Sequence, residues 1–321
     1  MAENDTPDGK DQGGFEQALV TRIAQEFLAE QRRARRWGIF FKLLLVFYLF
    51  LLLGIYGSNQ RDLAGGEFSG KPHTALVEIN GVISDDSEAS ADYIVAGLRA
   101  AFDDDNTKGI ILRINSPGGS PVQAGYVNDE IHRLRKKHPD VPVYAVITDL
   151  CASGGYYIAV AADKIYADKA SIVGSIGVIM AGFGFVDTLQ KLGVERRLMH
   201  AGKNKGFLDP FSPLKADEAA HADAMLNDIY QQFIKVVKEG RGKRLKDDDR
   251  IFSGLVWTGE QSVELGLVDG LGSTGYVARE VIGAEHIVDY TRHENYFDRF
   301  AKRFGAAMAD RFYSLGGVKL Y

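Results

Sequence analysis

The stretch GIILRINSPGGSP, residues 109–121, decides the fold class of this chain. Its first half is almost continuously apolar, which is typical of a strand that is buried on both faces of a parallel sheet. Two glycines, Gly118 and Gly119, follow the strand, and Pro121 stands where the first turn of a helix is expected. The stretch therefore predicts a strand, a tight glycine loop and a helix in direct succession.

The same order recurs on both sides of this stretch. Strand patterns occupy residues 74–83 and 141–149, and helical patterns occupy residues 90–104, with Ser90 as N-cap, and 121–138. The second helix places Val127, Ile131 and Leu134 on one face. Further along, we expect a helix near 186–193, a strand near 195–202 and a long helix over about 216–240. This alternation predicts an α/β domain with a largely parallel sheet.

Composition excludes several classes of protein. The net charge is −5 and the basic residues are spread along the chain, apart from one cluster, so no basic face for nucleic acid is expected. Cys151 is the single cysteine of the sequence, which rules out an intramolecular disulfide and leaves no zinc-binding set. The sequence therefore predicts neither a metal nor a cofactor, and no nucleic acid as partner.

An apolar run over residues 37–57 has the length of a membrane-spanning helix. Four arginines precede it and the flank that follows is much less basic, so the positive-inside rule places the N-terminus in the cytoplasm. A cleaved signal peptide is the alternative, but the run is longer than the usual apolar region of such a peptide and no A-x-A site follows it. We expect an anchor, with a short cytoplasmic helix before it that carries Leu19, Ile23 and Phe27.

These patterns divide the chain into five parts. We expect a cytoplasmic segment at 1–36, the transmembrane anchor at 37–57, a polar and glycine-rich linker at 58–72, the main domain at 73–285 and an amphipathic tail at 286–321. The main domain then lies on the other side of the membrane from the N-terminus.

A second glycine loop follows the strand at 141–149 and contains Ser153, Gly154 and Gly155. In a parallel sheet, the loops that follow the strands meet at one edge, so this loop and the loop of Gly119 are expected to lie together. A serine at the start of a helix has an uncrowded hydroxyl, and the nearby backbone N–H groups are free to bind an oxyanion. By itself, however, the sequence ASGG is more often a close packing contact than a catalytic site.

Three segments together resemble a known family: RINSPGGS, then ASGGYYIAVAADKIYA about 35 residues later, then GSIGVI. They are similar to the signal peptide peptidase A family of membrane-anchored serine proteases, and the resemblance covers about residues 74–275. It implies the crotonase-like ββα superhelix that this family shares with the Clp proteases. It is most specific around Ser153.

The resemblance implies a Ser/Lys dyad in place of a Ser-His-Asp triad. Ser153 matches the nucleophile, and Lys205, three residues after Gly202, matches the general base, with Lys203 as the alternative. Ser175 matches a serine that orients the lysine amine. The oxyanion donors would be the backbone amides of Gly119 and Gly154.

A lysine serves as a base only when its amine is neutral, and burial away from water favours the neutral form. Phe207, Leu208 and Phe211 follow Lys205 and offer apolar surroundings once a substrate or a neighbouring subunit covers them. Without the resemblance, Lys205 would be interpreted as a solvated loop lysine. His200 lies close by and leaves a Ser/His arrangement open, whereas Cys151 is expected to point into the sheet.

The function that these features imply is an endopeptidase anchored in the bacterial inner membrane, with its catalytic domain on the extracytoplasmic side. Its substrates would be signal peptides left by signal peptidase and other unfolded polypeptides. The family's rings or domes imply a homo-oligomer, and the sequence leaves open whether Ser153 and Lys205 of one site come from the same protomer or from neighbouring protomers. A crotonase-type acyl-CoA enzyme and a non-catalytic membrane quality-control scaffold are the alternatives.

Overall fold

The computed structural model describes residues 32–33, 35–52, 54 and 70–293, and the chain divides into two compact units, residues 1–70 and 71–321. In the first unit, residues 35–52 are helical and expose their apolar side chains. Within the described residues, no helix combines the length and the apolar character that crossing a bilayer requires. Residues 53 and 55–57 of the expected anchor, and the helix expected around Ile23, lie outside the described residues.

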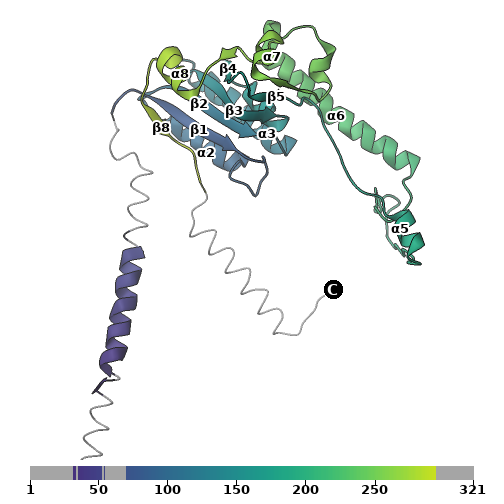
Figure 1. Ribbon diagram of the computed structural model, residues 1–321, viewed down its shortest axis with the longest axis horizontal. Coiled ribbons are helices and arrows are strands. Elements are labelled where there is room, and N and C mark those ends of the chain that lie inside the picture. Colours follow the sequence, from purple (N-terminus) through teal and green to yellow (C-terminus); the bar gives the residue numbers. More distant parts are fainter. Residues whose placement is uncertain (1–31, 34, 53, 55–69, 294–321) are drawn as a thin grey trace, which may run out of the picture. The chain divides into compact units, whose positions relative to one another are not determined.

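The second unit contains a largely parallel sheet (Figure 1). Its main path runs in the order β6-β5-β3-β2-β1-β8, and β4 and β7 extend it beside β3. All the pairings are parallel except that of β5 with β6. The strands are β1 His73–Asn80, β2 Thr107–Ser116, β3 Val143–Ala152, β4 Lys164–Ala167, β5 Ile172–Gly174, β6 Val256–Thr258, β7 Gly270–Leu271 and β8 Ile287–Asp289. The predicted α/β class is confirmed.

Helices α2 Ala91–Phe102 and α3 Pro121–Lys137 contribute to the main core with one face of the sheet. Ser90 occupies the N-cap position of α2, although its side chain makes no capping bond. The residues predicted for the inner face of α3, Val127, Ile131 and Leu134, are all buried. Their spacing of three and four residues places them on one side of a helix, where the strands of the sheet exclude water.

The other face of the sheet is covered by the helical segment formed by α8 Thr274–Tyr276 and η3 Val277–Ile282 (Figure 1). Val277 and Ala278 from this segment form a second, smaller core with Leu76, Ile111 and Val146 of the sheet. Both faces of the central strands are therefore buried, as their apolar sequences predict.

Strand β3 pairs with different neighbours along its length. Its first half, up to Ile147, lies beside β4, and its last three residues, Leu150 to Ala152, lie beside β5. The register with β2 shifts in the same region, between Ile114 and Ser116. The sheet therefore divides at the carboxyl end of β3, where the short helix α4 Gly154–Ala159 begins.

After β5 the chain leaves the core as an arm, which we define as residues 177–215. It contains α5 Val186–Lys191, as predicted, and none of its side chains is buried. The arm leads into α6 Ala216–Arg241, also as predicted, and lies at the end of α6 that is remote from the sheet (Figure 1). The strand predicted near 195–202 is wrong. Among the described residues, no strand pairs with this segment to complete its backbone hydrogen bonds.

Several short elements escaped the sequence patterns. They are η1 Gly242–Arg244, η2 Asp249–Phe252, α7 Gly259–Glu264 and the strands β4, β6, β7 and β8. Strand β8 pairs with β1 and lies beyond residue 285, so the sheet extends into the segment expected to be an amphipathic tail. Residues 294–321 lie outside the described residues.

Candidate active site

Ser153 stands between the end of β3 and the start of α4. Its backbone has φ 51° and ψ −121°, a left-handed conformation that non-glycine residues rarely adopt. Its amide donates a hydrogen bond to the carbonyl of Gly174 on β5, at 2.9 Å. Strain of this kind persists only where the surrounding structure imposes it, and it is often found at nucleophiles and ligand clamps. The turn leaves the Ser153 side chain half-buried, at a sharp corner of the sheet edge.

The loop of Gly118 and Gly119 lies directly against this corner, as predicted. A Cβ added to Gly118 would lie 2.7 Å from the Cβ of Ser153 and 2.6 Å from the nitrogen of Gly154. Gly118 and Gly119 both have positive φ values, 94° and 150°. No side chain other than hydrogen therefore fits at Gly118, and the backbone approaches the serine closely because glycine stands there.

Two backbone amides face this site. Gly119 forms a parallel bridge with Ile83. In this bridge the amide of Ile83 donates to the carbonyl of Gly118, and the amide of Ser120 donates to the carbonyl of Ile83. The Gly119 amide therefore points away from Ile83 and toward Gly154. A Cβ added to Gly154 would lie 3.3 Å from the Gly119 nitrogen. Gly154 is the first residue of α4, so its own amide has no partner within the helix. In the described part of the chain neither amide donates a hydrogen bond to another group, so together they form a pair of donors suited to an oxyanion.

Ser175 lies next to Ser153. Ala152 and Gly174 are paired across β3 and β5, so the two serines follow each other at the ends of adjacent strands. Ser175 also has a positive φ, 53°, and its amide donates to the carbonyl of Leu255 at 2.8 Å. Both residues are therefore held in strained conformations by backbone hydrogen bonds, and Gly174 connects them.

Lys205 lies apart from these residues, on the exposed part of the arm. Phe207 contacts His221 near the start of α6 at a ring distance of 5.7 Å, whereas Tyr157 of α4 contacts Phe233 at 5.2 Å. His221 and Phe233 are about 18 Å apart along the helix, at a rise of about 1.5 Å per residue. Among the described residues, the Lys205 amine has no hydrogen-bond or ion-pair partner, and Lys203 is equally exposed. Within one chain, the structure brings four of the five predicted site residues together and leaves the lysine out.

The other candidate groups do not reach the serine. Cys151 is fully buried in the main core, and burial raises the pKa of its thiol. His200 is exposed on the arm with Lys205. His138 ends α3 and is half-buried against the ring of Phe102, so it is not the surface residue that a helical pattern would suggest.

One supporting residue was missed by the sequence patterns. The Ser116 hydroxyl donates to the carbonyl of Gly81 at 2.6 Å and accepts a hydrogen bond from the amide of Gly118 at 3.1 Å. It therefore fixes the glycine loop to the end of β1. A serine two residues before a glycine turn is the available signal, because serine hydroxyls commonly bond to backbone groups two residues on.

Comparisons with known proteins show which family the chain resembles. The profile described as Peptidase family S49 matches residues 135–285, which contain Ser153, Ser175 and Lys205. The chain is 46% identical over 186 residues to a protein of Brucella abortus named Na(+)/H(+) antiporter NhaA. That match spans 58% of this chain and 25% of the Brucella protein, so the chain corresponds to about a quarter of its length.

Two further relatives match more evenly. A "Putative protease" of Methanocaldococcus jannaschii is 32% identical over 258 residues, which is 77% of this chain and 81% of that protein. A "Putative signal peptide peptidase SppA" of Enterococcus faecium is 30% identical over 226 residues, covering 68% of this chain and 65% of that protein. The strained serine, the paired amides and the extent of these matches lead to one conclusion: the chain belongs to peptidase family S49.

Proposed function

We propose that this chain is a serine endopeptidase in which Ser153 is the nucleophile and Lys205 the general base. The observation that carries the proposal is the strained Ser153 at the start of α4, beside the unpaired amides of Gly119 and Gly154. A nucleophile on a sharp corner and two preorganised donors are the parts that acyl transfer requires. Membership of a peptidase family makes a peptide bond the substrate.

The chemistry follows from these positions. The Ser153 hydroxyl oxygen bonds to the carbonyl carbon of the peptide, and its proton passes to the neutral lysine amine. The carbonyl oxygen becomes negatively charged and accepts hydrogen bonds from the amides of Gly119 and Gly154. The carbon–nitrogen bond then breaks as the leaving amine takes the proton from the lysine. Water, deprotonated by the same amine, releases the acyl group from Ser153.

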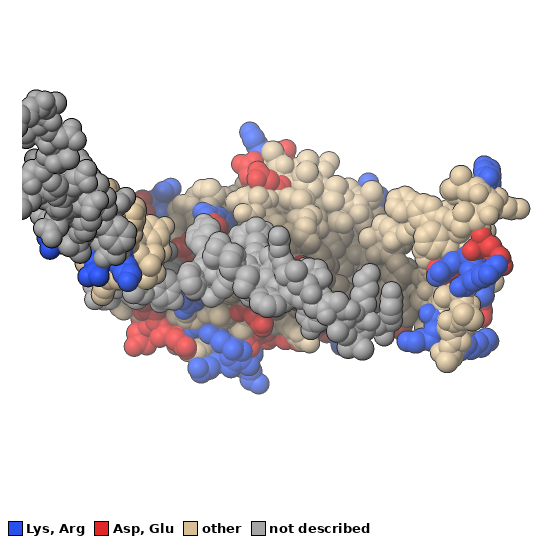
Figure 2. All heavy atoms as spheres, turned by 90° about the horizontal axis from the view of Figure 1, so that it is seen from below, with Lys and Arg blue, Asp and Glu red and all other residues tan. Residues whose placement is uncertain are grey.

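Lys205 comes from a second copy of the chain in this proposal. The arm exposes large apolar side chains, including Ile179, Phe183 and Met199, which a folded domain normally covers. On the face seen in Figure 2, charged side chains gather in several places, and uncharged surface lies between them. A ring or dome of copies would bury these apolar residues and bring each lysine to the serine of a neighbour.

We further propose that residues 37–57 anchor the protein in the bacterial inner membrane, with the N-terminus in the cytoplasm and residues 73–285 outside it. The apolar run and its arginine-rich flank support this orientation. The crotonase-like superhelix is supported by the change of partners along β3. The name of the Enterococcus relative supports remnant signal peptides as substrates.

A fluorophosphonate probe and a casein substrate test the nucleophile. We expect the probe to label Ser153, with fluoride leaving as the serine oxygen bonds to phosphorus, and both labelling and cleavage to disappear in Ser153→Ala. Cys151→Ala is the control and should keep both, because its side chain is buried. Full casein cleavage by Ser153→Ala would refute the proposal and favour a non-serine mechanism. Acyl-CoA turnover without casein cleavage would favour the crotonase-type alternative.

The base is tested separately. Lys205→Ala should lower kcat for peptide cleavage by about 10² or more, since general base catalysis typically contributes that much. Lys203→Ala is the matched control on the same loop and should keep most of the activity. If Lys203→Ala loses activity and Lys205→Ala keeps it, Lys203 is the general base. If both variants cleave peptides as the wild type does, His200 becomes the candidate base.

A further inference from the structure

Helix α6 connects the arm to the core, and its two halves differ. In the half that follows Tyr230, the side chains of Phe233, Val237 and Arg241 are buried at a spacing of four residues. In the first half, before Tyr230, only Glu218 and Ala222 are buried. The first half therefore supports the arm, and the second half fixes the helix to the rest of the domain.

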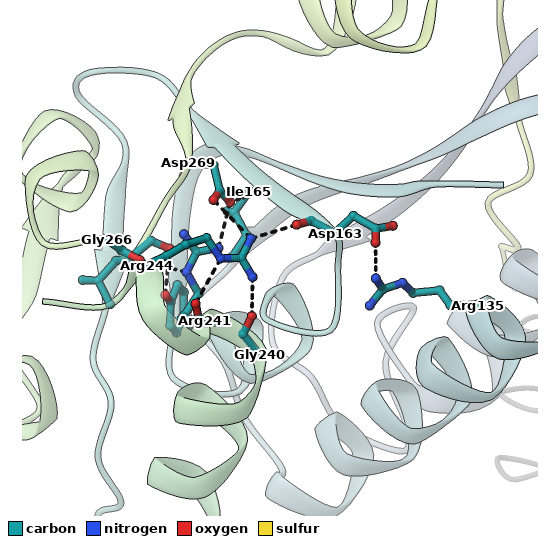
Figure 3. Close-up of polar contacts among 10 residues, drawn as sticks. Arg135, Asp163, Ile165, Gly240, Arg241, Arg244, Gly266 and Asp269 are labelled. Carbon is teal, nitrogen blue, oxygen red and sulfur yellow. Dashed lines mark hydrogen bonds and ion pairs between the residues drawn. The ribbon is translucent and has the colours of Figure 1, made fainter. Parts of the chain in front are cut away.

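The fixed end of α6 is held by a buried cluster of charges (Figure 3). The Arg241 side chain is 1% exposed, and its guanidinium donates to the carbonyl of Gly266 and the carboxylate of Asp269, both at 2.8 Å. Asp269 also accepts from the amide of Ile165 on β4 at 2.7 Å. Arg241 lowers the pKa of Asp269 in spite of its burial, so the carboxylate stays charged. This end of α6 is thus tied to the sheet through Asp269.

The arm end is held by Glu218, in the first turn of α6. Its side chain is only 7% exposed, which is unusual for a glutamate on a protruding segment. One carboxylate oxygen accepts from the amide of Leu208 at 3.0 Å, and the other pairs with the Lys215 amine at 2.7 Å. The Lys215 amine and the Leu208 amide lower the pKa of Glu218.

Leu208 is the residue through which Glu218 reaches the lysine loop. It has φ 54°, one of three non-glycine residues with positive φ in the described part of the chain, and the other two are Ser153 and Ser175. Lys205 is three residues earlier in the same succession of turns, which is closed by the hydrogen bonds from Lys205 to Gly202 and from Phe207 to Asn204, both 3.1 Å. The bond from Leu208 to Glu218 joins the backbone of these turns to α6, beside the ring contact of Phe207 with His221.

We propose that Glu218 is a positioning residue for Lys205, acting through the amide of Leu208. This inference rests on the proposed Ser153/Lys205 dyad. The hydrogen bond to Leu208 fixes the strained end of the lysine loop on α6, and Arg241 fixes α6 on the sheet. The loop is thereby held at a defined place before a neighbouring serine meets it. The ion pair with Lys215 is largely exposed on the lysine side and contributes little to this placement.

Three variants separate the two contacts of Glu218. Glu218→Ala removes both, Lys215→Met removes only the ion pair, and Glu218→Gln keeps an oxygen that accepts from Leu208. We expect Glu218→Ala to lower kcat by tenfold or more with KM changed less than twofold, because a misplacement of about 1 Å is worth up to about 10² in rate. Lys215→Met and Glu218→Gln should keep kcat within about threefold of wild type, since an exposed ion pair is worth little.

Assembly and melting temperature are measured for each variant with the full chain. The proposal would be overturned by a wild-type kcat in Glu218→Ala, or by an equal loss of kcat in Lys215→Met. It would also be overturned if the loss of kcat in Glu218→Ala came from unfolding or disassembly of the protein. Lys205→Ala, assayed with and without added ethylamine, tests the dyad itself. If Lys205→Ala is inactive and regains activity with the amine while Glu218→Ala matches wild type, only the positioning role fails. If Lys205→Ala is fully active, the dyad fails first.

Discussion

At the scale of single residues, the site depends on positions where the backbone adopts conformations that most side chains disfavour. Ser153 and Ser175 have positive φ values of 51° and 53°, and Gly118 and Gly119 supply two more in the facing loop. At the two serines this conformation costs energy, which the sheet edge offsets through bonds such as that from Ser153 to Gly174, whereas the two glycines adopt it freely. The result is a hydroxyl and two amides whose positions are set before a substrate binds.

Gly118→Ala tests this arrangement. The added methyl group would lie 2.6 Å from the Gly154 nitrogen and 2.7 Å from the Ser153 Cβ, so it would occupy the space that the oxyanion needs. We expect kcat to fall by about 10² or more, which is the usual effect of losing one oxyanion donor. Cleavage of a peptide substrate and labelling by a fluorophosphonate would both report it.

Gly125→Ala, in the middle of α3, is the matched control. No atom lies within 4 Å of its added Cβ, and alanine favours a helix more than glycine does. This variant should keep wild-type activity and raise the free energy of unfolding by about 0.5–1 kcal/mol. An unchanged kcat in Gly118→Ala would mean that the glycine loop does not form the oxyanion site.

At the scale of elements, α2 and α3 are joined by a carboxylate that lies between two arginines. Glu130 on α3 accepts from Arg99 of α2 and from Arg133, both at 2.7 Å, and its side chain is 11% exposed. Arg133 is the main cause of a lowered pKa for Glu130, with Arg99 adding to it, which brings the value to about 2 from its ordinary 4.5. The pair of helices that supports the glycine loop is thus stabilised by charge as well as by packing.

A lowered pKa in the folded state means that Glu130 stabilises the fold at pH values above its unfolded pKa. This contribution is lost as the pH falls from about 4.5 toward about 2, because the carboxylate must then bind a proton. Glu130→Gln should lower the free energy of unfolding at pH 7 by about 1 kcal/mol, since both arginines are more than half exposed and water screens the pairs.

Urea denaturation of the wild type and the variant at several pH values measures this effect. The Glu130→Gln curve should be flatter between pH 4.5 and 2, and Asp129→Asn, an exposed neighbour, should follow the wild type. Parallel curves for wild type and Glu130→Gln would exclude this carboxylate as a source of the acid sensitivity.

The sequence predicts the regular elements well and the short ones poorly. Helices such as α3 and α6 are long enough for their apolar spacing to be recognised, and β2 is a long apolar run. Strands of two to four residues, such as β4, β6 and β7, carry no such pattern and form because a neighbouring strand offers its backbone groups. The strand predicted near 195–202 failed for the complementary reason, since no strand in the described part of the chain pairs with it.

In the candidate site, too, some positions follow from the sequence and others do not. The juxtaposition of Ser153 with the loop of Gly119 follows from the rule that loops after parallel strands share one edge, so it was predictable. The bond of Ser116 to Gly81 depends on where β1 ends, which no local pattern gives. The position of Lys205 was least predictable, because it depends on the arm, whose large apolar residues the described part of the chain leaves exposed.

At the scale of the whole molecule, the arm and α6 support the proposed assembly. The arm exposes its apolar residues and the lysine, whereas the serine, its neighbour Ser175 and the two amides stay at the sheet edge. A chain with this division of parts would be inactive alone and active when a second copy supplies the lysine. Peptide cleavage would then depend on assembly, which would protect other proteins from a free monomer.

Subunit mixing tests this central claim most directly. Ser153→Ala and Lys205→Ala chains, each inactive alone, would be co-expressed so that they assemble together, and casein cleavage would be measured. If the serine of one copy works with the lysine of another, random mixing in equal amounts should restore about a quarter of the wild-type activity per chain, because half of the intact serines would meet an intact lysine. Mixed assemblies that stay as inactive as either parent would contradict the account.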